Sequence, residues 1–248
     1  MLCVYLILLF GDIPAISKLL MMKGHNGYCP CRCCEIRGVR VPGEKVNYFP
    51  LHCEDGVHNL LSLRRQHHHR FIKQAKRVIV AETVAESNRL SCKYRIKGLP
   101  SLFLLGSVRF PASFPFNFMH LIFKNLIPNL IWHYTGDFKG LDTGTETYEL
   151  PKRVWEAITA AAAQSGDTIP SKFGAQMPNI STERSSMTAE TWSTWIMSLG
   201  PILLQGQFSK PIYYEHFSEL SCLVHLCISY EMKHSDIELI RNGFAEWV

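Results

Sequence analysis

The sequence predicts a mostly α-helical chain with a few strands, an α+β protein, and three observations support this class. Most of the chain after residue 59 carries apolar side chains at helical spacing, with recognisable helix starts. Residues 4–10 form a continuous run of branched and aromatic side chains, as in a buried strand. Residues 24–58 are rich in glycine, proline, cysteine and polar side chains, which indicates a loop-like insertion.

The composition is that of a folded protein with a mild positive charge. The chain has 248 residues, of which 47% are hydrophobic and 19% are charged, and this argues against global disorder. The net charge of +5 permits a polyanionic partner without requiring one. Nine cysteines, four of them between residues 29 and 34, indicate a reducing compartment and a metal, because so tight a cluster rarely meets disulfide geometry twice.

The apolar run at residues 4–10 is interpreted as a strand that leads to Asp12. A signal peptide explains it less well because no basic segment precedes it, and it is far too short to span a bilayer, so no membrane partner is expected. Pro14 sits where a first helical turn tolerates proline, and a short helix is expected over residues 15–23. Asp12 is placed to cap that helix, which the residues alone favour over a role as a metal ligand.

The cysteine cluster is the strongest sign of a metal. Cys31 and Cys34 have the spacing of half a zinc site, and thiolate ligands favour zinc over harder ions. We favour His52 and Cys53 as the two remaining ligands. Other nearby side chains offer alternative ligand sets: His25, Cys29, Cys33 and His58. The competing interpretation is a set of free buried cysteines.

A basic segment lies within residues 59–88, where apolar side chains recur at near-helical spacing. Its basic residues are Arg64, Arg65, His67, His68, His69, Arg70, Lys73, Lys76 and Arg77. Such a run is suited to phosphate contacts that would weaken with salt. It is equally compatible with a solvated helix face, which the residues alone favour.

The remainder of the chain is predicted as helices joined by loops. A buried helix is expected from Asn117 towards His133, interrupted near Pro128, and Asn117 and His120 are expected to share one face of it. Thr188 is expected to cap a later helix with Ile202 among its inward residues. The later helices are predicted at 151–164, 188–204, 211–232 and 235–248.

Four short motifs occur in a fixed order along the chain. They are Gly11-Asp12-Ile13-Pro14-Ala15, Gly24-His25-Asn26-Gly27, Cys31-x-x-Cys34 and Phe116-Asn117-Phe118-Met119-His120-Leu121. In this order and spacing they resemble the transposases of CACTA (En/Spm-type) DNA transposons, above all the copies expanded in mushroom-forming fungi. The resemblance covers nearly the whole chain.

This resemblance implies a partial ribonuclease-H-like core, interrupted by a zinc-binding loop and a helical insertion. It implies an acidic triad with Mg²⁺ or Mn²⁺ as catalytic cofactor, and structural zinc besides. Asp12 matches the family's second catalytic aspartate, His120 matches the histidine of its Asp-x-x-His motif, and Glu190 is our choice for the third acid. The implied organisation is a core strand and helix at 1–23, a zinc insertion at 24–58, a helical insertion at 59–187 and returning helices at 188–248.

Two departures from the family bear on activity. The family's first aspartate lies on an earlier strand that this sequence does not include, so the chain resembles an N-terminally truncated member. Asn117 stands where the family has the aspartate of Asp-x-x-His, and a neutral amide does not replace an anionic carboxylate at a metal. We therefore expect a transposase-derived domain, related to DNA strand cleavage and transfer, that does not cut DNA in this form.

The expected partners are DNA at transposon ends and further copies of the chain through self-association. The expected location is the nucleus, or the cytoplasm for a decayed fragment, and not the secretory route. The leading alternative is a non-catalytic, zinc-stabilised module that binds protein or nucleic acid. A small hydrolase unrelated to transposition is a weaker alternative.

Overall fold

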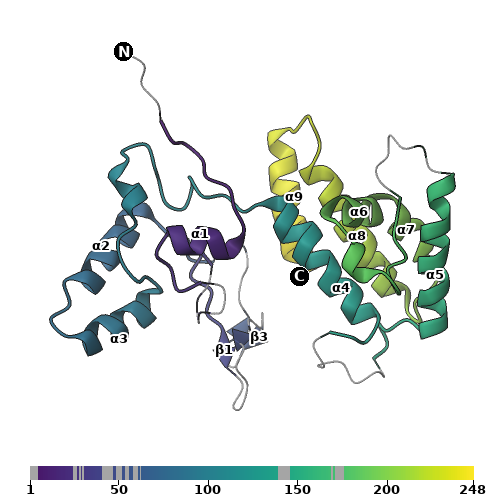
Figure 1. Ribbon diagram of the computed structural model, residues 1–248, viewed down its shortest axis with the longest axis horizontal. Coiled ribbons are helices and arrows are strands. Elements are labelled where there is room, and N and C mark those ends of the chain that lie inside the picture. The colour runs from purple at the N-terminus through teal and green to yellow at the C-terminus, as the bar shows by residue number, and fades with distance from the viewer. Residues whose placement is uncertain are drawn as a thin grey trace. The chain divides into compact units, whose positions relative to one another are not determined.

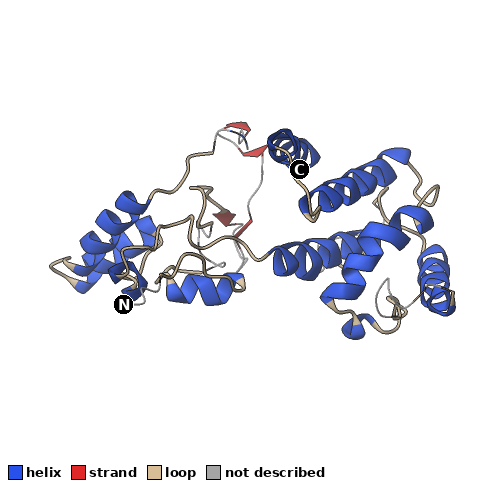
Figure 2. Cartoon of the chain, turned by 90° about the horizontal axis from the view of Figure 1, so that it is seen from above, coloured by secondary structure: helices blue, strands red, loops and turns tan. Residues whose placement is uncertain are grey.

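Two compact units make up the chain, Met1–Asn117 (unit 1) and Phe118–Val248 (unit 2). The computed structural model describes residues 5–24, 27, 29, 31–40, 47–48, 52–53, 56–57, 61, 63–138, 146–168, 170 and 176–248. Helices are the main regular structure of both units, and each described strand is two residues long (Figures 1 and 2). The predicted mostly α class is confirmed.

In its described residues, unit 1 contains three α-helices and two small strand pairs (Figure 1). Its helices are α1 (Ile13–Leu19), α2 (His68–Ile79), α3 (Val84–Tyr94) and the 3-10 helix η2 (Ser101–Leu104). Antiparallel pairing joins β1 (Val39–Arg40) to β2 (Asn47–Tyr48), and β3 (His52–Cys53) to β4 (Gly56–Val57). The predicted helical region 59–88 therefore resolves into α2 and the start of α3, which pack against each other.

The start of α1 confirms the predicted helix cap. Oδ1 of Asp12 accepts a hydrogen bond from the backbone N–H of Ala15 at 2.6 Å, and Pro14 lies in the first turn, where its missing N–H is not needed. The helix begins at Ile13 and ends at Leu19, slightly before the predicted range.

The predicted buried strand at residues 4–10 is wrong over the described residues 5–10, which belong to neither a helix nor a strand. Tyr5, Ile7 and Phe10 are 68%, 66% and 60% exposed. A strand needs a neighbour that supplies a ladder of backbone hydrogen bonds. The N–H of Leu9 donates to the Ser113 carbonyl, but within the described residues no partner strand pairs with this segment despite its strong β propensity.

One face of α2 packs into the core of unit 1. Phe71, Ala75 and Val78 are buried, and their spacing places them on one side of the helix. The Phe71 ring lies 4.2 Å from that of Phe110 and 5.4 Å from that of Phe103. The buried core members are Ile16, Leu20, Met22, Phe71, Ala75, Ile96, Val108, Phe110 and Phe114. The opposite side of α2 therefore faces solvent.

His68 makes the stability of unit 1 dependent on pH. Its Nδ1 accepts the Phe110 N–H at 3.0 Å, which requires a neutral ring. Burial, followed by Arg109 and His69, lowers the pKa of His68 below its ordinary value. As pH falls through about 6.5 the unfolded chain takes up the proton first, so unit 1 is expected to be most stable above that pH and to lose stability below it.

Calorimetry between pH 7.5 and 5 measures this loss in the unit 1 transition. His68→Asn keeps an acceptor that does not titrate, and we expect it to flatten the pH dependence. His69→Asn is the control and should behave like the wild type. An unchanged pH dependence in His68→Asn would contradict the role assigned to His68.

All regular structure in the described residues of unit 2 is helical. Its longer helices are α4 (Ile127–Tyr134), α5 (Lys152–Gln164), α8 (Pro211–Cys227) and α9 (His234–Trp247). The shorter elements are η3 (Met119–Leu126), η4 (Ser165–Asp167), η6 (Arg184–Ser186), α6 (Ala189–Thr194), η7 (Trp195–Leu199) and α7 (Gly200–Leu203). The four helices predicted from residue 151 onward are present, and Thr188 caps α6 through the Thr191 N–H.

Two helices of unit 2 change type before a proline. The segments η3 and η7 are π-helical, and Pro128 and Pro201 lie two positions after their last residues. The amide of Ile127 bonds to the carbonyl of Ile122, and that of Gly200 to Trp195, five residues back in each case. Since proline lacks an N–H and clashes with a carbonyl four residues earlier, the wider π turn relieves both problems. The predicted interruption near Pro128 is thus a change of helix type.

The shared helix face predicted for Asn117 and His120 is wrong, because Asn117 precedes the helix. The inward position predicted for Ile202 is also wrong, since its side chain is 71% exposed. Within the described ranges, every helix is too short or too polar to cross a bilayer.

Gly200 lies where the core of unit 2 has no space for a side chain. A Cβ at this position would lie 2.6 Å from the ring of Phe217 and 2.9 Å from the carbonyl oxygen of Trp195. Gly200→Ala is therefore expected to destabilise unit 2 by about 2 kcal/mol through overpacking. All five tryptophans lie in unit 2, so urea unfolding followed by tryptophan fluorescence reports this unit alone.

Ile202→Ala is the control on the same helix of unit 2, since this side chain is 71% exposed and its removal should leave the unfolding midpoint unchanged. Equal midpoints for Gly200→Ala and the wild type would show that the helix packing at α7 and α8 is looser than described.

Candidate functional site

Positive charge is concentrated in unit 1. Its sequence contains 17 Lys and Arg against 7 Asp and Glu, a formal net charge of +10. Unit 2 contains 9 Lys and Arg against 14 Asp and Glu, a net charge of −5. The mild total of +5 conceals this division, which makes unit 1 the half of the chain suited to a polyanion.

The solvent-facing side of α2 carries much of this charge. The buried side of α2 consists of Phe71, Ala75 and Val78. Side chains about half a helical turn from these residues therefore point to solvent. Those side chains are His69, Arg70, Lys73, Lys76 and Arg77, which we call the basic face. The helix contains no acidic residue. Its apolar and basic sides are therefore sharply separated.

Two exposed lysines, Lys73 and Lys76, lie at the centre of the basic face. Among the described residues neither forms an ion pair. Arg77 donates to the hydroxyl oxygen of Tyr94 on α3 at 3.1 Å, which holds its guanidinium at the edge of the face. Arg70 is engaged by a carboxylate from the cysteine loop, residues 29–35 of the sequence.

The cysteine loop gathers thiol groups around Cys31. The backbone N–H groups of Cys33 and Cys34 donate to Sγ of Cys31 at 3.3 and 3.4 Å. Hydrogen bonds from the Cys33 and Cys34 thiols lower the pKa of Cys31 well below its ordinary value, and the two amides lower it further. The same contacts raise the pKa values of Cys33 and Cys34. The two amide donors therefore favour a thiolate at Cys31 over one at Cys33 or Cys34.

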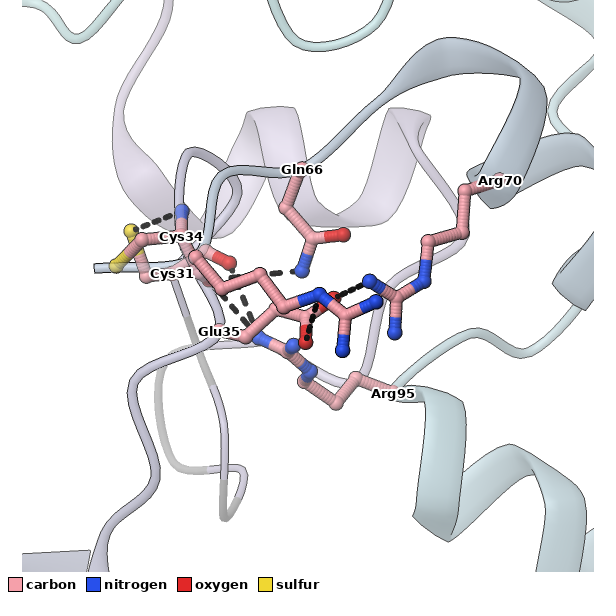
Figure 3. A network of polar contacts seen from close by, with 7 residues as sticks. Cys31, Cys34, Glu35, Gln66, Arg70 and Arg95 are labelled. Atoms are coloured by element: carbon pink, nitrogen blue, oxygen red, sulfur yellow. Dashed lines mark hydrogen bonds and ion pairs between the residues drawn. The ribbon is translucent and has the colours of Figure 1, made fainter. Parts of the chain in front are cut away.

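Arg95 holds the cysteine loop from the end of α3 (Figure 3). Its Nη1 donates to the carbonyl oxygens of Cys29, Cys31 and Cys34 at 3.1, 3.3 and 3.3 Å. The residue is buried, and it closes α3 in the left-handed conformation with φ of 66°. Glycine is favoured at such a position, so the guanidinium contacts explain why arginine is present.

A second buried arginine fixes the other side of the loop. Arg32 is 3% exposed, and its Nε and Nη2 donate to the carbonyl oxygens of Phe114 and Pro115 at 2.7 and 2.8 Å. Its guanidinium carbon lies 3.9 Å from the centre of the Phe116 ring, a cation–π contact. The cysteine loop is thus anchored to a segment more than 80 residues away in sequence.

Backbone bonds tie the end of the cysteine loop to the start of α2. The N–H of Glu35 donates to the carbonyl of Arg64 at 2.9 Å, and that of Gln66 to the carbonyl of Cys33 at 3.0 Å. The Glu35 carboxylate contacts Arg70 at 2.6 Å and Arg64 at 3.6 Å (Figure 3). The cysteine loop and the basic face therefore form one connected structure.

The predicted zinc ligands are described only in part. Cys31 and Cys34 lie together in the loop, while the side chains of His52 and Cys53 lie outside the described residues. Among the side chains that are described, no group of three or more His, Cys, Asp and Glu is arranged to hold a metal ion. The N–H bonds to Cys31 Sγ are an arrangement that fits a thiolate ligand, and zinc stays a prediction.

The three residues assigned to catalysis are divided between the units. Asp12 lies in unit 1, where its carboxylate caps α1. His120 on η3 and Glu190 in the first turn of α6 lie in unit 2, and these two elements pack against each other. The structure thus brings the elements of His120 and Glu190 together, and a triad that includes Asp12 stays a prediction.

Unit 2 contains a cavity of about 930 Å³ with a different character. Its lining includes four carboxylates, from Asp137, Glu146, Glu149 and Glu156, together with Lys152 and Arg184. A surface with this excess of negative charge repels phosphates. The cavity therefore does not compete with α2 as a place for a polyanion.

Sequence reasoning found the cysteines and the basic run but missed Arg32, Glu35 and Arg95. Each of these acts through contacts to distant carbonyl or guanidinium groups. No local sequence pattern predicts a buried arginine. The neighbours of Arg95 include Lys93 and Lys97, which give no reason to expect that it is buried. No protein family model, curated protein or solved structure matches this chain.

Proposed function

We propose that this chain is a DNA-binding module derived from a CACTA-type transposase, and that the basic face of α2 contacts DNA phosphates. The observation that carries the proposal is the separation of charge: +10 in unit 1, with exposed Lys73 and Lys76 on one face of a helix. Lysine and arginine contacts to phosphates supply most of the sequence-independent affinity for DNA. The order of the four motifs supports the transposase origin and, with it, a nuclear location and self-association.

DNA cleavage by this chain is not expected. The Asp12 carboxylate is used as a helix cap, and the side chain at residue 117 is a neutral amide. A ribonuclease-H-like core with Mg²⁺ or Mn²⁺ at Asp12, His120 and Glu190 belongs to the proposed ancestry of the chain. Metal-dependent nicking of plasmid DNA that Asp12→Ala abolishes would favour an active nuclease instead.

Structural zinc is part of the same proposal, with Cys31, Cys34, His52 and Cys53 as ligands. The amide donors on Cys31 Sγ favour the thiolate that zinc needs. Protein purified without chelators is expected to contain about one equivalent of zinc, and Cys31→Ser or Cys34→Ser is expected to lose it. Cys222→Ser, at an exposed position in unit 2, is the control. Equal zinc content in all four proteins would remove this part of the proposal.

The affinity of the wild-type chain for a 20-base-pair duplex, measured by fluorescence anisotropy from 50 to 300 mM salt, tests DNA binding. About four phosphate contacts give a slope of about −3.6 in a plot of log K against log salt. A slope near zero, or no binding at 50 mM salt, would favour the alternative of a protein-interaction module.

A further inference from the structure

We propose that Arg64 and Arg70 form a second phosphate-binding site at the start of α2, and that the carboxylate of Glu35 occupies this site in the wild-type chain in competition with DNA phosphates. This inference rests on the proposed function, because the phosphate that would replace Glu35 belongs to the bound DNA. It adds a site outside the central lysines and a residue that controls it.

The geometry is that of an anion held between two guanidinium groups (Figure 3). One carboxylate oxygen of Glu35 lies 2.6 Å from Nη1 of Arg70, and the other lies 3.6 Å from Nε of Arg64. Carboxylate and phosphate oxygens present the same geometry to arginine, which binds both. The Glu35 side chain thus shows where an anionic oxygen fits.

The surroundings of this site favour an anion. Arg70 lies in the first turn of α2, a helix of 12 residues whose start has no side-chain cap and no acidic residue in its first turn. The backbone N–H groups at such an end carry partial positive charge. The guanidinium pair adds to this charge, and Glu35 is the carboxylate that offsets it.

The site is open enough for exchange. The Arg64 and Arg70 side chains are 70% and 32% exposed, whereas Glu35 is 17% exposed. Both guanidinium groups are open to a phosphate that approaches from solvent, and the longer Arg64–Glu35 contact, with Arg64 largely exposed, is worth little. The backbone bond from the Glu35 N–H to Arg64 holds residue 35 in place whatever its side chain does.

Glu35 therefore lowers DNA affinity in two ways. It neutralises one charge beside the basic face, and it competes with phosphate for two arginines. If Glu35 only supported the fold of the loop, its replacement would weaken DNA binding, because the start of α2 would become disordered.

Glu35→Gln separates these roles in the anisotropy assay described above. We expect about tenfold tighter binding at 100 mM salt and a slope steeper by about 1.8, the value for two additional phosphate contacts. Glu86→Gln is the matched control: it makes the same change of charge on α3, where Glu86 pairs with Arg89 at 2.7 Å. It should leave the slope unchanged.

Arg70→Gln completes a double-mutant cycle. Alone it should alter the wild-type affinity little, because Glu35 already occupies Arg70, whereas in the Glu35→Gln background it should remove about half of the gain in slope. Weaker or unchanged binding by Glu35→Gln, while the wild type binds with a steep salt dependence, would overturn this inference alone. Failure of the wild type to bind would overturn the proposed function with it.

Discussion

Reversing the charge of Lys73 and Lys76 is expected to lower the DNA affinity of the chain about 100-fold at 50 mM salt. Each reversal removes an attraction to phosphate and adds a repulsion. Two such changes amount to about 3 kcal/mol at the effective dielectric of a protein surface, and each 1.4 kcal/mol is a factor of ten. The slope against log salt should become shallower by about 1.8, since two phosphate contacts are lost. Anisotropy with the same duplex measures both quantities.

The matched control reverses Lys152 and Lys210, which are exposed lysines of unit 2. This variant undergoes the same change in total charge but leaves the basic face intact. We expect it to bind within about twofold of the wild type, because neither lysine belongs to the basic face of α2. Similar losses in both variants would mean that overall charge, not the face of α2, determines affinity.

Replacing Arg95 is expected to produce the largest loss of stability in unit 1. Arg95→Met leaves the carbonyl oxygens of Cys29, Cys31 and Cys34 without their donor in a buried setting. Loss of a buried charged donor costs about 3 kcal/mol. The rate at which Cys29, only 5% exposed, reacts with iodoacetamide reports the opening of the loop. The reaction should accelerate about 100-fold if opening limits it.

Two further variants isolate the guanidinium. Arg95→Gly removes it but relieves the left-handed backbone by about 1 kcal/mol, so it should remain less stable than the wild type and more stable than Arg95→Met. Arg89→Met removes an exposed arginine of the same helix and should leave the Cys29 reaction rate unchanged. A wild-type rate in Arg95→Met would mean that the three carbonyl contacts contribute nothing to the loop.

Local patterns were sufficient to predict much of the helical structure. Thr188 and Asp12 cap their helices as expected because a cap depends on residues three positions apart. The helix at 152–164 follows from Pro151 and an alanine run, again a local signal. The basic character of α2 was also evident, although its division from α3 was not.

Features that depend on distant partners could not be predicted. Residues 5–10 have the composition of a strand, yet pairing requires a neighbouring strand that the described residues do not supply. Arg95 reaches carbonyl groups 61 to 66 residues away, and Glu35 reaches arginines at 64 and 70 across the cysteine loop. No rule based on residue spacing predicts such contacts. The candidate site therefore appeared in the sequence as separate cysteines and a basic run, without the residues that connect them.

The most direct measurement is the reactivity of individual lysines towards acetylation, read by mass spectrometry with and without saturating duplex DNA. If the basic face of α2 contacts phosphates, Lys73 and Lys76 will be protected in the complex, while Lys152 and Lys210 will react as they do in the free chain. Unchanged acetylation of Lys73 and Lys76 in a saturated complex, or protection confined to the lysines of unit 2, would contradict the account.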